Sequence, residues 1–287
     1  MLRLDPRHPP LFRGATSLQF GVDAVVVVDP LTRWQERLIG ALVEGIPAAA
    51  FDACARAFGA QADSVPPFRR LLEPVLREVD DPPRPVVRLE LPHDLDATLA
   101  ETLTDACTET GAAPESAPWW DLGSLPIAPG PPVVAVAAHV LDPRRTARFM
   151  RDDVRHLPIV LSPDRVEVGP LVIPGVTACP ACLDAHRRDA DAAWPAIAVQ
   201  LLRLPSPATP RSILYDAAIL ARRMISARPG SVSRSATIRV RHGRPTWHEH
   251  RPHADCHCRS LARTGRSVAP VVPFPAPTTV TASARRA

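Results

Sequence analysis

The chain has 287 residues, of which 46% are hydrophobic, so it can bury the core of one large domain or of two smaller ones. No apolar run approaches the roughly 18 residues that a membrane-spanning helix needs, so we expect no contact with a membrane. The net charge of +4 arises in the tail, because residues 259–287 carry five arginines and no acid while residues 1–258 sum to −1. A nucleic-acid-binding protein normally presents a basic face, so nucleic acid is not the expected partner.

The first eighty residues predict three short strands. They are expected at Pro10–Arg13, Ser17–Phe20 and Val25–Val28, and glycine-containing turns at 14–16 and 21–23 separate them. The third is β-branched throughout and short, as in a strand covered on both faces.

Three helices follow these strands. The first has Thr32 as its N-cap and apolar residues three or four positions apart, namely Leu31, Trp34, Leu38 and Leu42. The second is expected at Ala48–Phe58. The third follows Pro66 and carries apolar residues as far as Val79, and Pro74 should kink or shorten it.

Three strands followed by three helices is the order of a small winged-helix unit. Residues 1–82 resemble the PqqD-like peptide-recognition domains, also called RiPP recognition elements, which bind the leader segment of a precursor peptide. In that family the leader adds as a strand along the third strand and lies against the third helix. The resemblance implies a peptide groove in this chain formed by Val25, Val26, Val27, Val28, Phe68, Leu72, Val75 and Leu76.

Two other interpretations of this unit remain open. The groove residues could belong only to the hydrophobic core. The unit could also be a DNA-binding winged helix, whose recognition helix should carry surface arginines. The basic candidates Arg69, Arg70 and Arg77 stand beside Glu73, Glu78 and Asp80.

After a proline-rich joint at 80–85, strands and helices alternate. Strands are expected at Val86–Leu91, Val133–Ala138 and Leu157–Leu161, and helices at Asp94–Thr110 and Pro143–Val154. Such alternation is typical of an α/β fold with a parallel, Rossmann-like sheet. We therefore expect a second domain at 83–258, followed by a disordered tail at 259–287 that is rich in arginine and proline.

Four cysteines near the C-terminus form two close pairs, Cys179 with Cys182 and Cys256 with Cys258. Four thiolates in two such pairs suit tetrahedral Zn²⁺, and a shell filled by protein ligands on all four sides is structural rather than catalytic. His253 and His257 flank the second pair and could replace a cysteine as ligand.

Two disulfides are the alternative to zinc. They would need an oxidising compartment, and the segment Met1–Pro6 contains no apolar signal sequence, so we expect a cytoplasmic protein. The other two cysteines, Cys54 and Cys107, lie in helical stretches and are interpreted as buried apolar residues.

The segment Val168–Cys182, with a Val-Gly-Pro-Leu-Val motif, a Pro-Gly pair and the C-x-x-C motif, is followed by Asp184-Ala-His-Arg and an expected hairpin of Thr237–Arg241 and Thr246–His250. Residues 84–258 thereby resemble the ThiF/MoeB branch of the ubiquitin-activating superfamily. They are most similar to the divergent ThiF-like proteins of thiazole/oxazole-modified microcin pathways. The resemblance implies a leader peptide and a YcaO-type cyclodehydratase as partners, and a possible homodimer.

One motif of the adenylating members is missing. The turn after their first strand is rich in glycine, which lets backbone N–H groups approach the phosphates of ATP. Here the turn lies in Leu89–Leu95, which contains no glycine, includes Pro92, and carries Glu90 and Asp94, which would repel a polyphosphate. ATP is therefore not an expected cofactor.

The sequence favours a leader-peptide-binding scaffold that presents a precursor peptide to a modifying enzyme. The alternatives are an ATP-dependent adenylating enzyme of the ThiF type and a zinc-stabilised winged-helix DNA-binding protein.

Overall fold

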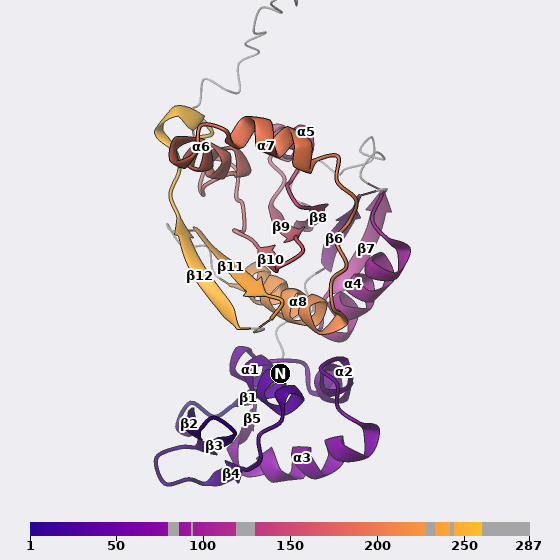
Figure 1. The fold of residues 1–287 in the computed structure, drawn as a ribbon, viewed down its shortest axis with the longest axis vertical. Coiled ribbons are helices and arrows are strands. Elements are labelled where there is room, and N and C mark those ends of the chain that lie inside the picture. The colour runs from indigo at the N-terminus through magenta and orange to yellow at the C-terminus, as the bar shows by residue number, and fades with distance from the viewer. Residues whose placement is uncertain (80–85, 93, 119–129, 228–232, 242–243, 260–287) are drawn as a thin grey trace, which may run out of the picture.

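The computed structural model describes residues 1–79, 86–92, 94–118, 130–227, 233–241 and 244–259 (Figure 1). The joint expected at 80–85, His93 of the glycine-free turn, and the expected tail beyond Arg259 lie outside these residues.

The N-terminal unit contains the expected three strands and three helices. The strands form an antiparallel sheet in the order β2-β3-β4. At the start of α1 the side chain of Gln35 accepts a hydrogen bond from the backbone N–H of Thr32, which confirms the predicted cap. The bounds are β2 Pro10–Gly14, β3 Ser17–Phe20, β4 Val26–Val28, α1 Arg33–Glu44, α2 Phe51–Ala57 and α3 Val65–Leu72.

The third helix is shorter than the sequence pattern suggested. It ends at Leu72, followed by a 3-10 turn at Glu73–Val75 and then strand β5, Leu76–Glu78. Pro74 has no backbone N–H to continue the helical ladder, which explains the early end. Strand β5 pairs antiparallel with β1, Leu2–Leu4, and neither strand was expected from the sequence.

The second part of the described chain is a three-layer α/β structure. One sheet has the order β12-β11-β10-β9-β8-β6-β7. Strands β7, β6, β8 and β9 are parallel, whereas β10, β11 and β12 continue the sheet antiparallel, so the expected parallel sheet is in fact mixed. The strand bounds are β6 Val86–Leu91, β7 Ala113–Pro118, β8 Val133–Ala138, β9 His156–Leu161, β10 Arg165–Val168, β11 Ser233–Arg239 and β12 Pro245–His250.

Helices cover both faces of this sheet. Alternate residues of β8 face opposite layers: Val134 and Val136 join the main hydrophobic core, while Val133 and Ala135 join a second cluster with Phe149 of α5. The helix bounds are α4 Ala97–Glu109, α5 Pro143–Arg151, α6 Pro180–Ala190, α7 Trp194–Leu201 and α8 Arg211–Ser226.

Helix α8 lies between the sheet and the N-terminal unit (Figure 1). It contacts α4 and strands β9 to β11 on one side, and α1 and α2 of the N-terminal unit on the other. Gly111, which follows α4 at φ +97°, also lies at this junction, because a Cβ there would come within 2.6 Å of Pro47 Cγ. The two parts therefore share one continuous hydrophobic core.

Within the described residues, no helix has both the length and the apolar character that crossing a lipid bilayer requires.

Candidate functional site

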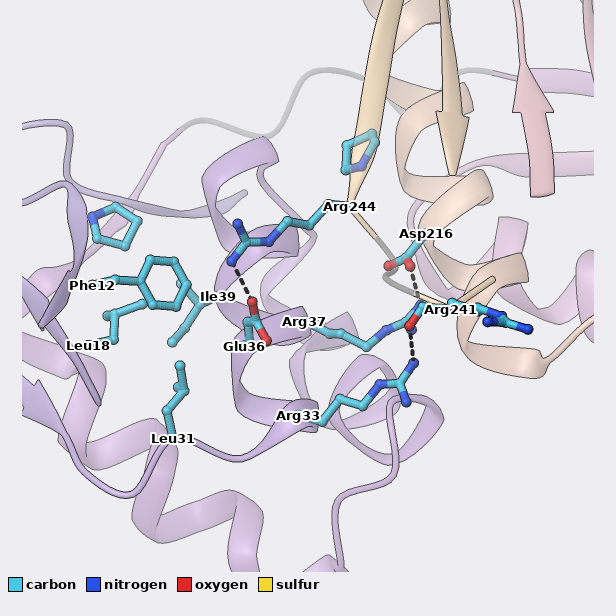
Figure 2. Close-up of a pocket in the computed structure, with 12 residues that line it drawn as sticks. Phe12, Leu18, Leu31, Arg33, Glu36, Arg37, Ile39, Asp216, Arg241 and Arg244 are labelled. Carbon is cyan, nitrogen blue, oxygen red and sulfur yellow. Dashed lines mark hydrogen bonds and ion pairs between the residues drawn. The ribbon is translucent and has the colours of Figure 1, made fainter. Parts of the chain in front are cut away.

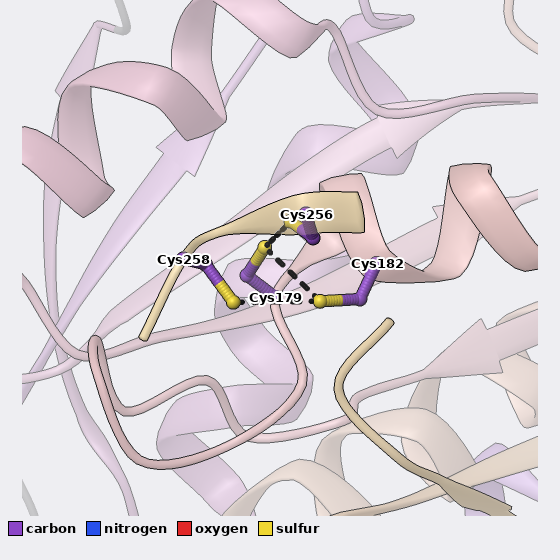
Figure 3. Close-up of side chains that lie close together, drawn as sticks. All are labelled: Cys179, Cys182, Cys256 and Cys258. Carbon is purple, nitrogen blue, oxygen red and sulfur yellow. Dashed lines mark hydrogen bonds between the residues drawn. The ribbon is translucent and has the colours of Figure 1, made fainter. Parts of the chain in front are cut away.

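The four cysteines predicted to act together do converge (Figure 3). Their Sγ atoms all lie within 4.8 Å of one another. The sulfur of Cys179 is 3.7 Å from that of Cys182 and 3.4 Å from that of Cys256, and the sulfurs of Cys182 and Cys258 are 3.4 Å apart. The cluster joins the start of α6 to the turn that follows β12.

Local backbone geometry aims each pair at the same point. Cys179 is the N-cap of α6, Pro180 starts the helix with φ already suited to it, and the N–H of Cys182 donates to the carbonyl of Cys179 at 2.9 Å. In the second pair, His257 adopts a left-handed φ of 51°, which turns the chain tightly between Cys256 and Cys258. The residues within and next to each cysteine pair therefore set the turn that brings its two sulfurs together.

The donor set fits a tetrahedral metal ion. Zinc–sulfur bonds of 2.3 Å place tetrahedral ligands about 3.8 Å apart, close to the observed separations. All six cysteines are free rather than disulfide-bonded. Burial raises the pKa of Cys179 to about 12, and repulsion from neighbouring thiolates adds to the shift. A bound cation would supply the positive charge that stabilises the deprotonated thiolates.

The surroundings of the cluster are those of a structural site. Cys179 and Cys182 are buried with Val172 and Ala178. The flanking histidines are not part of this ligand group within the described residues. His253 instead contacts Asp189 Oδ2 through Nε2 at 2.7 Å. If a tetrahedral ion is bound, the four sulfurs would fill its shell and leave no position for substrate.

The residues of the predicted peptide groove fall into two groups. Phe68, Leu72 and Val75 are buried in the main core together with Val26 and Val28. Val25 is exposed, Val27 is half-buried, and Leu76 is half-buried in β5 rather than on the third helix. The rings of Trp34 in α1 and Phe68 meet edge to face at 5.0 Å between centroids, which fixes α3 against α1.

Strand β4 forms one edge of its sheet. Among the described residues it pairs only with β3, through Leu18 with Val28, Gln19 with Val27 and Phe20 with Val26. Its backbone groups on the other side have no strand partner within that part of the chain. An edge of this kind is the position at which an added strand can pair.

A small cavity lies where the carboxyl ends of β6 and β8 meet. Because β7 and β8 lie on opposite sides of β6, this is the switch point at which sheets of this type bind nucleotides. The cavity has a volume of about 150 Å³, below the roughly 300 Å³ of small ligand pockets. Pro92, Asp94, Asp142, Arg144 and Arg145 contribute to its lining.

A buried ion pair beside this cavity was not expected from the sequence. Arg145 donates to the carbonyl of Val136 at 2.7 Å and lies 3.7 Å from the carboxylate of Glu90. Burial raises the pKa of Glu90 and lowers the pKa of Arg145, although each charge stabilises the ionised form of the other residue. The signal available in the sequence was an acidic residue, Glu90, between two leucines of a strand.

Comparison with known proteins gives structural similarities only. No family model and no curated protein matches the sequence. The heterocyclase TruD is 14% identical with a TM-score of 0.44, covering 88% of this chain but 41% of that chain, so this chain spans about two fifths of its length. A chain of the E. coli microcin synthetase McbBCD complex with pro-MccB17 bound is 12% identical with a TM-score of 0.44. This similarity covers 90% of this chain and 99% of that chain.

E. coli MccB with AMPCPP and MccA is 11% identical with a TM-score of 0.42, and the similarity covers 89% of this chain and 98% of that chain. Similarities with TM-scores below 0.5 assign neither a family nor an activity.

Proposed function

We propose that the protein is a peptide-binding scaffold in the biosynthesis of a ribosomally made, modified peptide. Its N-terminal unit would be a PqqD-like recognition element that takes the leader as an additional strand along β4. Its α/β part would be a ThiF-like platform that presents the peptide to a YcaO-type enzyme. The observation that carries the proposal is the open edge of β4 within the described residues, together with the exposed side chain of Val25.

The burial of Phe68, Leu72 and Val75 refines this proposal. Because these side chains belong to the core, they would support the strand rather than contact the peptide. Affinity would come mainly from backbone hydrogen bonds along β4, with contacts from Val25 and Val27.

The proposed mode of binding is tested by titrating a labelled leader peptide, encoded beside this gene, into the full-length protein. In strand addition, alternate backbone amides of the peptide face the sheet edge. N-methylation at alternate positions should therefore weaken binding about tenfold or more, and methylation at the positions between them should not. A uniform response along the peptide, or no binding of any encoded leader, would contradict the proposal.

We propose Zn²⁺ as the ion held by Cys179, Cys182, Cys256 and Cys258. Zinc would tie the start of α6 to the turn after β12 and so hold the end of the sheet in place. The support is the four-sulfur donor set with tetrahedral spacing.

We also propose that the platform does not use ATP. The cavity at the carboxyl ends of β6 and β8 is small, and Arg145 is held by its bonds to Val136 and Glu90. The adenylating-enzyme alternative predicts ATP binding tighter than about 1 mM, which calorimetric titration can detect. Such binding, or pyrophosphate exchange with a candidate peptide, would favour that alternative.

Helix α7 would provide the contact with the modifying enzyme. None of its residues is buried, and Ile197 and Val199 are 37% and 55% exposed. An apolar helix left uncovered on a soluble surface commonly marks a protein interface.

Substitution at this surface separates partner binding from leader binding. Val199→Glu should abolish co-purification with the YcaO-type enzyme encoded beside this gene and leave leader affinity unchanged. Gln200→Glu, at the next position of the helix, is the matched charge control. If Val199→Glu changed the oligomeric state instead, the helix would belong to an interface between two copies of this chain.

A further inference from the structure

A larger cavity lies between the N-terminal unit and the α/β part (Figure 2). Its volume of about 750 Å³ falls within the range of small-ligand and peptide side-chain pockets. Its walls come from β2, β3, the start of α1, α8 and the ends of β11 and β12. The lining residues are Pro10, Phe12, Leu18, Leu31, Arg33, Glu36, Arg37, Ile39, Asp216, Arg241, Arg244 and Pro245.

One side of the cavity is apolar. Figure 2 shows Phe12, Leu18, Leu31 and Ile39 together on this side, away from most of the charged groups. Leu18 and Ile39 are buried, whereas Phe12 is half exposed. The guanidinium of Arg244 stacks over the Phe12 ring at 4.9 Å. An apolar side chain of a ligand could therefore be covered here on more than one side.

The opposite side is positively charged. Four arginines face two carboxylates, and both carboxylates are already paired: Asp216 with Arg37, and Glu36 with Arg244. Within the described residues, Arg33 donates to the backbone carbonyl of Arg241, at 3.1 Å, and has no carboxylate partner. The side chain of Arg241 extends away from the apolar residues in Figure 2, so its carbonyl rather than its guanidinium meets Arg33. Among the four guanidinium groups, that of Arg33 therefore remains for an anion.

Further features of the same wall favour an anion. Arg33 is the first residue of the twelve-residue helix α1, so the positive end of the helix dipole adds to the arginine charge. Within the part of the chain that the structure describes, the buried Nε atom of Arg37 has no hydrogen-bond partner. The two carboxylates limit the net charge of Arg33, Arg37 and Arg244 to about +1, which suits one carboxylate better than a polyphosphate.

We infer that this cavity binds an acidic segment of the peptide substrate, with an apolar side chain against Phe12 and a neighbouring carboxylate on Arg33. The inference rests on the proposed function for the source of the peptide, but the site itself rests only on the cavity and its charges. It would be a second contact, separate from the edge of β4. Because the walls come from both parts of the protein, an occupied cavity would also hold those parts together.

The test uses two small probes with the full-length protein. N-acetyl-Leu-Glu amide carries the carboxylate, and N-acetyl-Leu-Gln amide has the same shape without the charge. By NMR titration we expect the acid to bind about tenfold or more tightly than the amide, because charge-assisted bonds to arginine would be lost in the amide. Equal binding, or no binding of either probe at about 10 mM, would overturn the inference.

Variants place the binding in this cavity. Arg33→Gln should reduce binding of the acid to the level of the amide. Arg234→Gln removes an arginine that pairs with Glu249 outside the cavity lining, and it should leave the acid-to-amide ratio unchanged. Because Arg33 is exposed, Arg33→Gln is expected to fold. Survival of acid-selective binding in a folded variant would refute the site.

The two proposals can fail separately. Val27→Pro, which disturbs the edge of β4, should weaken leader binding but leave acid-selective binding of the probe intact. If Val27→Pro loses leader binding but retains probe binding, the leader binds at the edge of β4 and the probe binds elsewhere. If Val27→Pro retains leader binding but loses probe binding, the leader does not depend on that edge.

Discussion

At the scale of single residues, buried charges join the two parts of the protein. Arg37 in α1 forms an ion pair with Asp216 in α8, and the side chains are 8% and 15% exposed. Burial raises the pKa of Asp216 to about 7, even though the positive charge of Arg37 stabilises the ionised form of Asp216. The unfolded chain releases this proton near pH 4. The contribution of Asp216 to stability is therefore full below about pH 4 and is lost as the pH rises through about 7.

This linkage predicts a pH-dependent effect of Arg37→Met. At pH 8 the substitution leaves a buried carboxylate without its partner, and the free energy of unfolding should fall by about 3 kcal/mol. At pH 5 Asp216 is protonated, so the loss should be clearly smaller. Urea unfolding at both pH values measures the difference.

Arg234→Met is the matched control for this experiment. Arg234 and Glu249 form an exposed pair, at 62% and 55%, so the loss should stay below about 1 kcal/mol at either pH. Equal losses for Arg37→Met at pH 5 and pH 8 would show that Asp216 does not titrate in this range.

At the scale of helices and strands, local patterns predicted the elements whose signals are local. Strands such as β3 and β8 followed from short β-branched or alternating runs between turn residues, and the convergence of the four cysteines followed from their spacing in two close pairs. The strands β1, β5 and β7 were missed, because the first two are three residues long and β7 has the sequence Ala-Pro-Glu-Ser-Ala-Pro. Only tertiary pairing makes these three segments strands. Strand β10 was also missed, although its sequence Arg-Val-Glu-Val alternates.

The longest helix was also missed. Helix α8 has eleven buried residues among sixteen, so it lacks the polar face that reveals an amphipathic helix. The cavity between the two parts could not be predicted either, because its walls join residues between Pro10 and Ile39 to Asp216, Arg241, Arg244 and Pro245. No spacing in the sequence reports such a distant juxtaposition.

The metal proposal predicts that removing zinc loosens one end of the sheet. The purified protein should contain about one zinc per chain, and a chelator should lower Tm because metal binding contributes to folding. Cys182→Ser should lower both zinc content and Tm, whereas Cys107→Ser, which changes a buried cysteine of α4 outside the cluster, should leave zinc content unchanged. Protein without metal and with two oxidised cysteine pairs would contradict the proposal.

Helix α4 allows a separate test of local stability. The side chain of Asp96 caps the helix by accepting from the N–H of Leu99 at 3.1 Å. Asp96→Ala should reduce the free energy of unfolding by about 1 kcal/mol. Asp105→Ala, at an exposed interior position of the same helix, should change it little or raise it slightly, because alanine has the higher helix propensity. Equal effects of the two substitutions in urea unfolding would show that the cap is not important.

At the scale of the whole molecule, the N-terminal unit and the α/β part share one hydrophobic core. Helices α1 and α2 pack on α8, and a single core cluster includes residues of both parts. The cavity and the Arg37–Asp216 pair lie at the same junction. A peptide bound at this junction could therefore affect both parts at once, as a scaffold for presentation to an enzyme requires.

We expect the full-length protein to unfold in one transition, with both parts losing protection from hydrogen exchange at the same urea concentration. Leu42→Ala, at a fully buried position of α1, should cost about 2–5 kcal/mol and shift the transition of the α/β part as much as that of the N-terminal unit. Val43→Ala, at the neighbouring position that is 44% exposed, is the matched control and should shift neither by a comparable amount. If Leu42→Ala shifted only the N-terminal unit, the two parts would unfold independently, and the shared core would not couple the peptide site to the platform.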